Sequence, residues 1–188
     1  MIVILAGRRI DAEDAGARRF PADQVKKVRE EIKLFFVENN PDWLVCSGAC
    51  GADLIALDVT VELNMPAKMI LPFDAETFRS TSVTDRKGNW GILFDSIHDE
   101  LNEKENVIIL NFTKDDKDAY EKTNVAILKT ADALFEVNGK QNIYTVSEKK
   151  VALIIWEGTP KDSNDTTDHF RKLAIESGYT IREINSLQ

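Results

Sequence analysis

The hydrophobic residues of the chain gather into short uninterrupted runs, separated by longer stretches in which they recur periodically. Continuous apolar runs of this length are typical of strands buried on both faces of a parallel sheet. Gly7, Ser47-Gly48 and Gly178 bound several of the runs, as turn residues do. The runs predict strands at 2–6, 43–46, 67–73, 106–112, 150–158 and 179–184.

Between these runs the apolar residues return at three- and four-residue steps, which is the spacing of one helix face. This periodicity predicts helices at 21–38, 52–63, 89–101, 120–135 and 166–177. Alternation of strands and helices implies right-handed crossovers and parallel pairing. We therefore predict an α/β fold with a Rossmann-like, mostly parallel sheet and helices on both of its faces.

Two stretches do not fit this alternation. Residues 75–88 are polar and predict a mobile loop, and residues 137–149 contain Asn138-Gly139, which favours a hairpin or a single edge strand. The length of 188 residues suits one domain. We therefore expect a single domain over 1–188, with elaborations near 75–88 and 137–149 beside its site.

The formal net charge of −8 argues against nonspecific nucleic-acid binding, because a polyanion is repelled on average. A small anionic ligand remains compatible with a local site. The two cysteines, Cys46 and Cys50, cannot build a disulfide framework, and their spacing with the two histidines does not predict a zinc site. With neither a signal peptide nor an apolar run of about 18 residues, we expect a cytoplasmic protein without a membrane partner.

The segment Ser47–Asp53, "SGACGAD", joins a predicted strand to a predicted helix. A helix N-terminus presents unpaired N–H groups, and glycines let a phosphate approach them closely. Asp53 could cap the helix or contact a ligand hydroxyl. The segment matches neither the Walker loop nor G-x-G-x-x-G. A phosphate cradle and a plain packing turn both explain its glycines.

Four segments occur in an order typical of a known family: "LAGRRID" (5–11), "VCSGACGADLIALDVTVELNMPAKMILP" (45–72), "TNVAILKTADAL" (123–134) and "ALIIWEGTPKDSNDTTDHFRKLAIESGYTIREI" (152–184). Together they resemble the SLOG superfamily, the DprA-like and LOG-like Rossmannoid proteins that include YspA-like members. The resemblance implies binding or sensing of a nucleotide or nucleotide-derived ligand. It requires no cofactor and is compatible with a homo-oligomer.

The resemblance assigns ligand contacts at positions that match the family motifs: Gly7, Arg9, Ser47, Gly48, Gly51, Ala52, Asp53, Gly158, Thr166 and Thr167. Arg8 and Arg9 are either a solvated loop pair or phosphate ligands, and we favour Arg9 for the ligand role. Tyr120 and Asn124, one helical turn apart, could contact a base or ribose or form a surface pair. Arg79 and residues 85–87 could close over an anion or remain a solvated loop.

The last turn, "EGTPKDSNDTTDHF", departs from the family pattern P-G-G-x-G-T-x-x-E, whose glutamate supports cleavage of an N-glycosidic bond. Asp165 or Asp168 could replace that glutamate, which makes hydrolysis of a nucleoside monophosphate or NAD-like substrate the alternative function. Asp165 is also a favourable helix N-cap. The acidic group formed with Glu157 and Asp162 would suit Mg²⁺. A third alternative is a structural or oligomer-forming domain whose turn holds no ligand.

Overall fold

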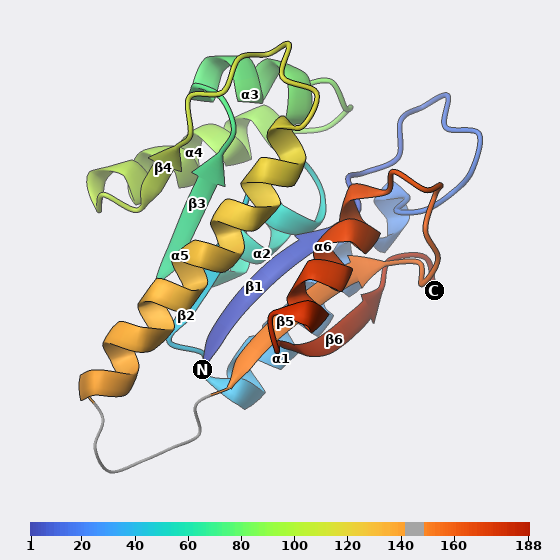
Figure 1. Cartoon of the computed structure of the whole chain (residues 1–188). Coiled ribbons are helices and arrows are strands. Elements are labelled where there is room, and N and C mark those ends of the chain that lie inside the picture. Colours follow the sequence, from blue (N-terminus) through green and yellow to red (C-terminus); the bar gives the residue numbers. More distant parts are fainter. Residues whose placement is uncertain (142–148) are drawn as a thin grey trace.

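The computed structural model of the chain describes residues 1–141 and 149–188, the side chains of 138–141 excepted. Its strands form one six-stranded sheet in the order β4-β3-β2-β1-β5-β6, and all neighbours are parallel (Figure 1). The strands are β1 (Ile2–Gly7), β2 (Trp43–Cys46), β3 (Ala67–Leu71), β4 (Val107–Ile109), β5 (Lys150–Trp156) and β6 (Thr180–Asn185). This topology confirms the predicted Rossmann-like α/β fold.

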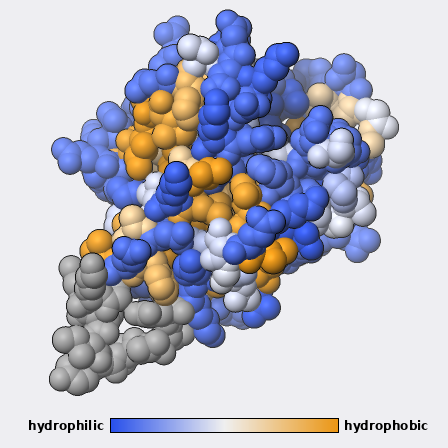
Figure 2. Space-filling view, in the orientation of Figure 1, coloured by the Kyte–Doolittle hydropathy of each residue, from blue (hydrophilic) through white to orange (hydrophobic). Residues whose placement is uncertain are grey.

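Helices cover both faces of the sheet, as the sequence predicts (Figure 1). Helices α1, α2 and α4 pack on one face, and α5 and α6 pack on the other, in front of the sheet in Figure 1. The helices are η1 (Ala22–Gln24), α1 (Val25–Asn39), α2 (Ala52–Glu62), α3 (Ala75–Ser82), α4 (Trp90–Glu103), α5 (Ala119–Gln141) and α6 (Thr166–Glu176). On the face drawn in Figure 2, hydrophilic side chains predominate and apolar ones gather between α5 and α6.

The strands read as unbroken apolar runs because successive side chains enter different cores. In β1, Val3 and Leu5 join the core beneath α1, α2 and α4, while Ile2 and Ile4 join the core beneath α5 and α6. Side chains of a strand alternate between the two faces, so burial on both faces leaves no position for a polar residue. The hydrophobic pattern thus predicts the strands well in the middle of the sheet.

The order of the strands reverses at β1. From β1 the chain adds β2, β3 and β4 on one side, and α5 then returns across the sheet so that β5 and β6 lie on the other side of β1. In open α/β sheets such a reversal opens a crevice beyond the carboxyl ends of the strands, where ligands bind. The end of β1 is therefore the place where a site is expected.

Both predicted elaborations need correction. Residues 75–88 are not simply a loop, because 75–82 form α3, which is N-capped by Asp74 (Oδ1 accepts from the Thr77 N–H at 2.9 Å) and anchored by the buried Phe78. At 137–149 the predicted hairpin or edge strand is wrong as far as residue 141, since α5 continues to Gln141. The remainder of that prediction, 142–148, lies outside the described residues.

Several element ends also differ from the prediction. The strand predicted at 67–73 ends at Leu71 because Pro72 cannot continue the ladder, and the one predicted at 106–112 shrinks to 107–109. The first predicted helix begins as the short 3-10 helix η1 before α1. Among the described residues, no helix is long and apolar enough to cross a bilayer.

Candidate functional site

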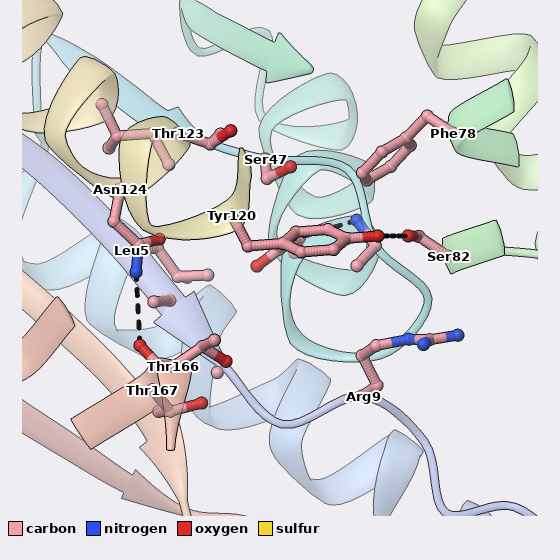
Figure 3. A pocket seen from close by; sticks show the side chains of 15 residues that line it. Leu5, Arg9, Ser47, Phe78, Ser82, Tyr120, Thr123, Asn124, Thr166 and Thr167 are labelled. Atoms are coloured by element: carbon pink, nitrogen blue, oxygen red, sulfur yellow. Dashed lines mark hydrogen bonds between the residues drawn. The ribbon is translucent and has the colours of Figure 1, made fainter. Parts of the chain in front are cut away.

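A cavity of about 280 Å³ lies at the carboxyl edge of the sheet, beyond β1 and β2 (Figure 3). The end of β1, the turn before α2, helix α3 and the first turns of α5 and α6 all contribute to its wall. Its lining residues are Leu5, Ala6, Gly7, Arg9, Ser47, Ala49, Asp53, Phe78, Ser82, Tyr120, Thr123, Asn124, Ile127, Thr166 and Thr167. The volume is close to the lower limit of about 300 Å³ for ligand pockets, so the cavity suits a small ligand.

The lining is divided into a buried floor and an exposed rim. On the floor, the polar side chains of Asp53, Ser82, Thr123 and Thr167 are buried. At the rim, Tyr120 is 42% exposed and the Arg9 side chain is 30% exposed. A ligand would therefore meet an aromatic ring and a cation on entering, and a carboxyl group and hydroxyl groups inside.

Asp53 is the only carboxylic acid among the lining residues that the structure describes. It lies in the first turn of α2 and is 8% exposed, and its Oδ2 accepts a hydrogen bond from the Ala49 N–H at 3.2 Å. Burial raises the pKa of Asp53 to about 7, although the Ala49 N–H and the positive charge of Arg9 oppose this shift. The acid therefore exchanges its proton near neutral pH.

Packing, rather than open space, explains the glycines around the turn. A Cβ on Gly7 would lie 2.4 Å from the Cβ of Ala52 and 2.7 Å from the carbonyl oxygen of Ile155. A Cβ on Gly51 would lie 2.6 Å from the Arg8 carbonyl oxygen, and Gly51 has a φ of +111°, a conformation that favours glycine. The loop after β1 thus packs directly on the start of α2.

Several backbone N–H groups of the turn already donate to protein acceptors. The N–H of Ala49 donates to Asp53, that of Cys50 to the Ser82 carbonyl at 3.0 Å, and that of Ala52 to the Arg8 carbonyl at 3.1 Å. Only Ser47, Ala49 and Asp53 of the turn line the cavity. A cradle made by the whole of Ser47–Asp53 is therefore not the geometry observed, and the accessible part of the turn consists of Ser47, Ala49 and Asp53.

Arg9 reaches the rim from the loop after β1, with its guanidinium pointing away from Asn124 and Thr167 (Figure 3). Its Nη2 donates to Asp85 and contacts the Cys50 Sγ at 3.6 Å. Asp85 also pairs with Arg86, whose Nε donates to the Ile10 carbonyl at 3.0 Å. Within the segment 85–87, Asp85 is thus the residue that forms an ion pair with Arg9 at the cavity mouth.

Arg8 points elsewhere and is 2% exposed. Its Nη1 donates to both oxygens of Asp165 at 2.7 and 2.6 Å, and its Nε and Nη2 donate to Glu157 at 2.6 and 3.1 Å. Nη2 also donates to the Thr159 carbonyl at 2.8 Å, and Arg19 pairs with Glu157. We name Arg8, Arg19, Glu157 and Asp165 the arginine–carboxylate cluster; it lies outside the cavity lining.

Asp165 and Asp168 do not occupy the positions that a catalytic role would require. The side chain of Asp165 caps α6 by accepting from the Thr167 and Asp168 N–H groups at 2.9 and 3.2 Å, so its predicted capping role is confirmed. Asp168 pairs with Lys172 at 2.6 Å and with Arg171 at 3.6 Å. Neither carboxylate lines the cavity, because Asp165 binds Arg8 and the start of α6 while Asp168 pairs with the basic side chains of its own helix.

The structure brings together six of the ten predicted ligand residues. Gly7, Arg9, Ser47, Asp53, Thr166 and Thr167 line the cavity, whereas Gly48, Gly51, Ala52 and Gly158 do not. Tyr120 and Asn124 also line the cavity. The Tyr120 hydroxyl and Ser82 Oγ form a hydrogen bond of 3.0 Å (Figure 3).

Sequence reasoning missed Phe78 and Ser82 because they belong to α3, which the sequence presented as a loop. It also missed Thr123, the residue beside Asn124 on α5. The regular spacing of Phe78 and Ser82, four residues apart and on one helix face, was the available signal.

Within residues 1–141 and 149–188 there is no group of three or more histidine, cysteine or acidic side chains arranged to hold a metal ion. The acidic residues proposed for Mg²⁺ have other partners: Glu157 and Asp165 bind Arg8, and Asp162 accepts from the Asn164 N–H at 2.7 Å. Cys46 and Cys50 are both free and buried. The described lining of the cavity therefore offers hydrogen-bonding groups, one cation (Arg9) and one carboxyl group (Asp53).

Comparisons with known proteins add little to this geometry. No family model matches the chain, and no curated protein matches it. Among solved structures, the UDP-GlcNAc 2-epimerase from Methanocaldococcus jannaschii is similar with a TM-score of 0.39 and 12% sequence identity, over 98% of this chain and 72% of that one. The α/β Rossmann-like fold is established by the sheet topology.

Proposed function

We propose that the chain binds a nucleotide or nucleotide-derived ligand in the cavity beyond β1 and β2. The observation that supports this most directly is the combination of an aromatic ring and a cation at the rim of a small polar cavity at the strand-order reversal. Nucleotides are recognised by stacking on aromatic side chains and by guanidinium pairing with phosphate. The resemblance to SLOG proteins points to the same class of ligand.

The rim residues suit the two ends of a nucleotide. Tyr120 offers a half-exposed ring on which a base could stack, and Asn124 beside it offers an amide, with its Nδ2 donating to the Thr166 carbonyl at 3.3 Å. Arg9 offers a guanidinium for phosphate, in exchange for its pairing with Asp85. Ser47, at the end of β2, adds a hydroxyl group beside these.

The experiment is isothermal titration calorimetry with the ribonucleoside 5′-monophosphates and ADP-ribose. We expect at least one of them to bind, and we expect Tyr120→Ala to weaken that binding about tenfold, because base–aromatic stacking contributes about 1–3 kcal/mol per base. Val125→Ala, on the same helix but outside the cavity lining, is the matched control and leaves the affinity unchanged. No heat with any of these compounds, or equal affinity in the Tyr120→Ala variant, would overturn the proposal.

Hydrolysis of an N-glycosidic bond is the less favoured function, because Asp165 and Asp168 lie outside the cavity lining. Such a reaction ordinarily uses a pair of carboxyl groups that flank the scissile bond, and Asp53 is the only one in the described lining. Chromatography of the titrated samples for free base decides between the two functions. Release of base at a rate proportional to protein concentration would replace binding with hydrolysis.

A further inference from the structure

One oxygen of Asp53 has no hydrogen-bond partner. Oδ2 accepts from the Ala49 N–H, but Oδ1 makes no hydrogen bond to any residue that the structure describes. The side chain is more than nine-tenths buried and lines the cavity. Oδ1 is not among the enclosed side-chain atoms that lack a partner, so it is open to the cavity and a ligand hydroxyl can reach it as a hydrogen-bond acceptor.

No cation of the described chain neutralises Asp53 either. Arg9, the cation of the lining, pairs with Asp85 instead, and Asp53 takes part in no ion pair with any described residue. A buried ionisable group without a counter-charge is costly, whereas packing alone would favour an apolar side chain there. The hydrogen bond from the Ala49 N–H offsets only part of the cost of burying this carboxyl group.

The position of Asp53 indicates which part of a nucleotide it would meet. The base and the phosphate are the two ends of a nucleoside monophosphate, and the sugar lies between them. If Tyr120 and Arg9 at the rim hold the two ends, the sugar faces the floor, where Asp53 lies with Thr123 and Thr167. The hydroxyl of Thr123 already donates to the Ala119 carbonyl at 2.7 Å, which leaves Asp53 as the strongest acceptor on the floor.

We propose that Oδ1 of Asp53 binds a ribose hydroxyl group, so that the cavity selects ribonucleotides over deoxyribonucleotides. This inference rests on the proposed function, since it names the part of the nucleotide that reaches the floor. A hydroxyl can both donate and accept a hydrogen bond, so it can pair with the carboxylate and with the protonated acid alike. An exocyclic amino group of a base only donates, so it can pair with an accepting oxygen of the acid but not with its O–H.

The test uses calorimetry with AMP, 2′-deoxy-AMP, 3′-deoxy-AMP and inosine 5′-monophosphate, on the wild type and on Asp53→Asn. For the wild type we expect one deoxy compound to bind about tenfold or more weakly than AMP, in line with a hydrogen bond to a charged group. In Asp53→Asn we expect the ratio to fall below about twofold. The asparagine keeps an acceptor for the Ala49 N–H, and a thermal melt confirms that the variant folds.

The control is Asp58→Asn, on the same helix but paired with Arg29 outside the cavity, which should keep the wild-type ratio. Equal binding of AMP and both deoxy compounds to the wild type overturns the inference and leaves nucleotide binding intact. Weaker binding of inosine 5′-monophosphate alone overturns it in favour of a base amino group. Binding of none of the four to the wild type overturns the proposed function for adenine nucleotides and the inference with it.

Discussion

Arg8 and Arg9 are neighbours in sequence, and the structure gives them opposite environments. Arg8 is buried and donates to Asp165, Glu157 and the Thr159 carbonyl. Arg9 reaches the cavity rim, where its Nη2 pairs with Asp85 at the partly exposed surface, and its buried Nε has no partner among the described residues. One arginine thus completes a closed network, while the other retains capacity for a ligand.

The arginine–carboxylate cluster and the polar groups of the cavity differ in the same way. In the arginine–carboxylate cluster, two cations face two carboxylates, and the Asp165 oxygens accept from Arg8, Lys161, Thr167 and Asp168. In the cavity, the carboxyl group of Asp53 faces no cation of the described chain at hydrogen-bonding distance. A saturated polar network fixes loops, and an unsaturated one is where binding is expected. The predictions below test this division.

The largest effect is expected from Arg8→Met. Removing the guanidinium leaves Glu157 and Asp165 buried beside each other, with Glu157 retaining Arg19. Breaking a buried pair in this way costs about 3–5 kcal/mol of unfolding free energy. Urea denaturation at pH 7 measures it, and Arg18→Met, which removes a surface pair with Asp23, should cost less than about 1 kcal/mol. Similar losses in the two variants would contradict the division.

A pH series extends this test. Burial, the largest single cause, would raise the pKa of Glu157 and Asp165. The hydrogen bonds from Arg8, together with those from the Lys161 N–H to Asp165 and from Arg19 to Glu157, outweigh it and lower both pKa values below the ordinary 4.5 and 3.8. Carboxylates with lowered pKa values stabilise the fold above those ordinary values and lose this contribution as the pH falls further. The wild type should therefore lose stability below about pH 4, and Arg8→Met should lose less over the same range.

The second effect is a loss of stability as the pH rises, the opposite of the dependence expected for Glu157 and Asp165. Asp53 has a folded pKa of about 7 against an ordinary 3.8, so the folded state holds its proton longer and stability falls as the pH rises between these values. At about 1.4 kcal/mol per pKa unit, the loss is roughly 4 kcal/mol at most. Asp53→Asn should remove it, so the variant should exceed the wild type in stability at pH 8 by more than at pH 5. A parallel pH dependence in both proteins would show that Asp53 titrates normally.

The third effect concerns the contact between the loop after β1 and the start of α2. Gly7→Ala introduces a methyl group 2.4 Å from the Cβ of Ala52, and overpacking of this kind costs about 1–3 kcal/mol. Thermal denaturation should show a lower Tm. Gly16→Ala, where a Cβ would meet nothing within 4 Å, should leave the Tm nearly unchanged. An unchanged Tm for Gly7→Ala would mean that the turn has room that the packing does not indicate.

The smallest effect should come from Asp85→Asn. Removing this charge frees Arg9 from its pair at the rim, where partial exposure keeps the interaction weak. We expect the affinity for a nucleoside monophosphate to rise about threefold, by calorimetry at low salt. Asp95→Asn, which frees Arg79 from a pair outside the cavity lining, should not change the affinity. A weaker affinity in Asp85→Asn would show that Asp85 positions Arg9 rather than competing for it.

The sequence predicts the fold better than the site because the two depend on different signals. Strands such as β1 and β5 are buried on both faces, so their apolar runs are visible without any tertiary information. The sequence did not predict helix α3, because its eight residues are mostly polar and Phe78 is its one large apolar residue. A pattern needs several periodic positions before it predicts a helix.

At the site, residue types alone do not determine which way a side chain points. Nothing in "GRR" distinguishes the arginine that enters the arginine–carboxylate cluster from the one that reaches the cavity, although the favoured choice, Arg9, does line it. Likewise Gly48 and Gly51 suggested close approach by a phosphate, whereas a Cβ on either would meet protein atoms: the Met69 and Phe94 side chains at Gly48 and the Arg8 carbonyl at Gly51. Sequence showed where the chain turns, and only tertiary packing shows which face of the turn stays open.

The salt bridge between Arg8 and Asp165 joins residues 157 positions apart. During synthesis from the N-terminus, the loop after β1 therefore has no partner for its arginine until β5 and the start of α6 have emerged. Contacts so distant in sequence form late, because they must await closure of the intervening chain. The wall of the cavity, which shares Gly7 and Arg9 with that loop and Thr166 and Thr167 with α6, is accordingly completed among the last parts of the molecule to form.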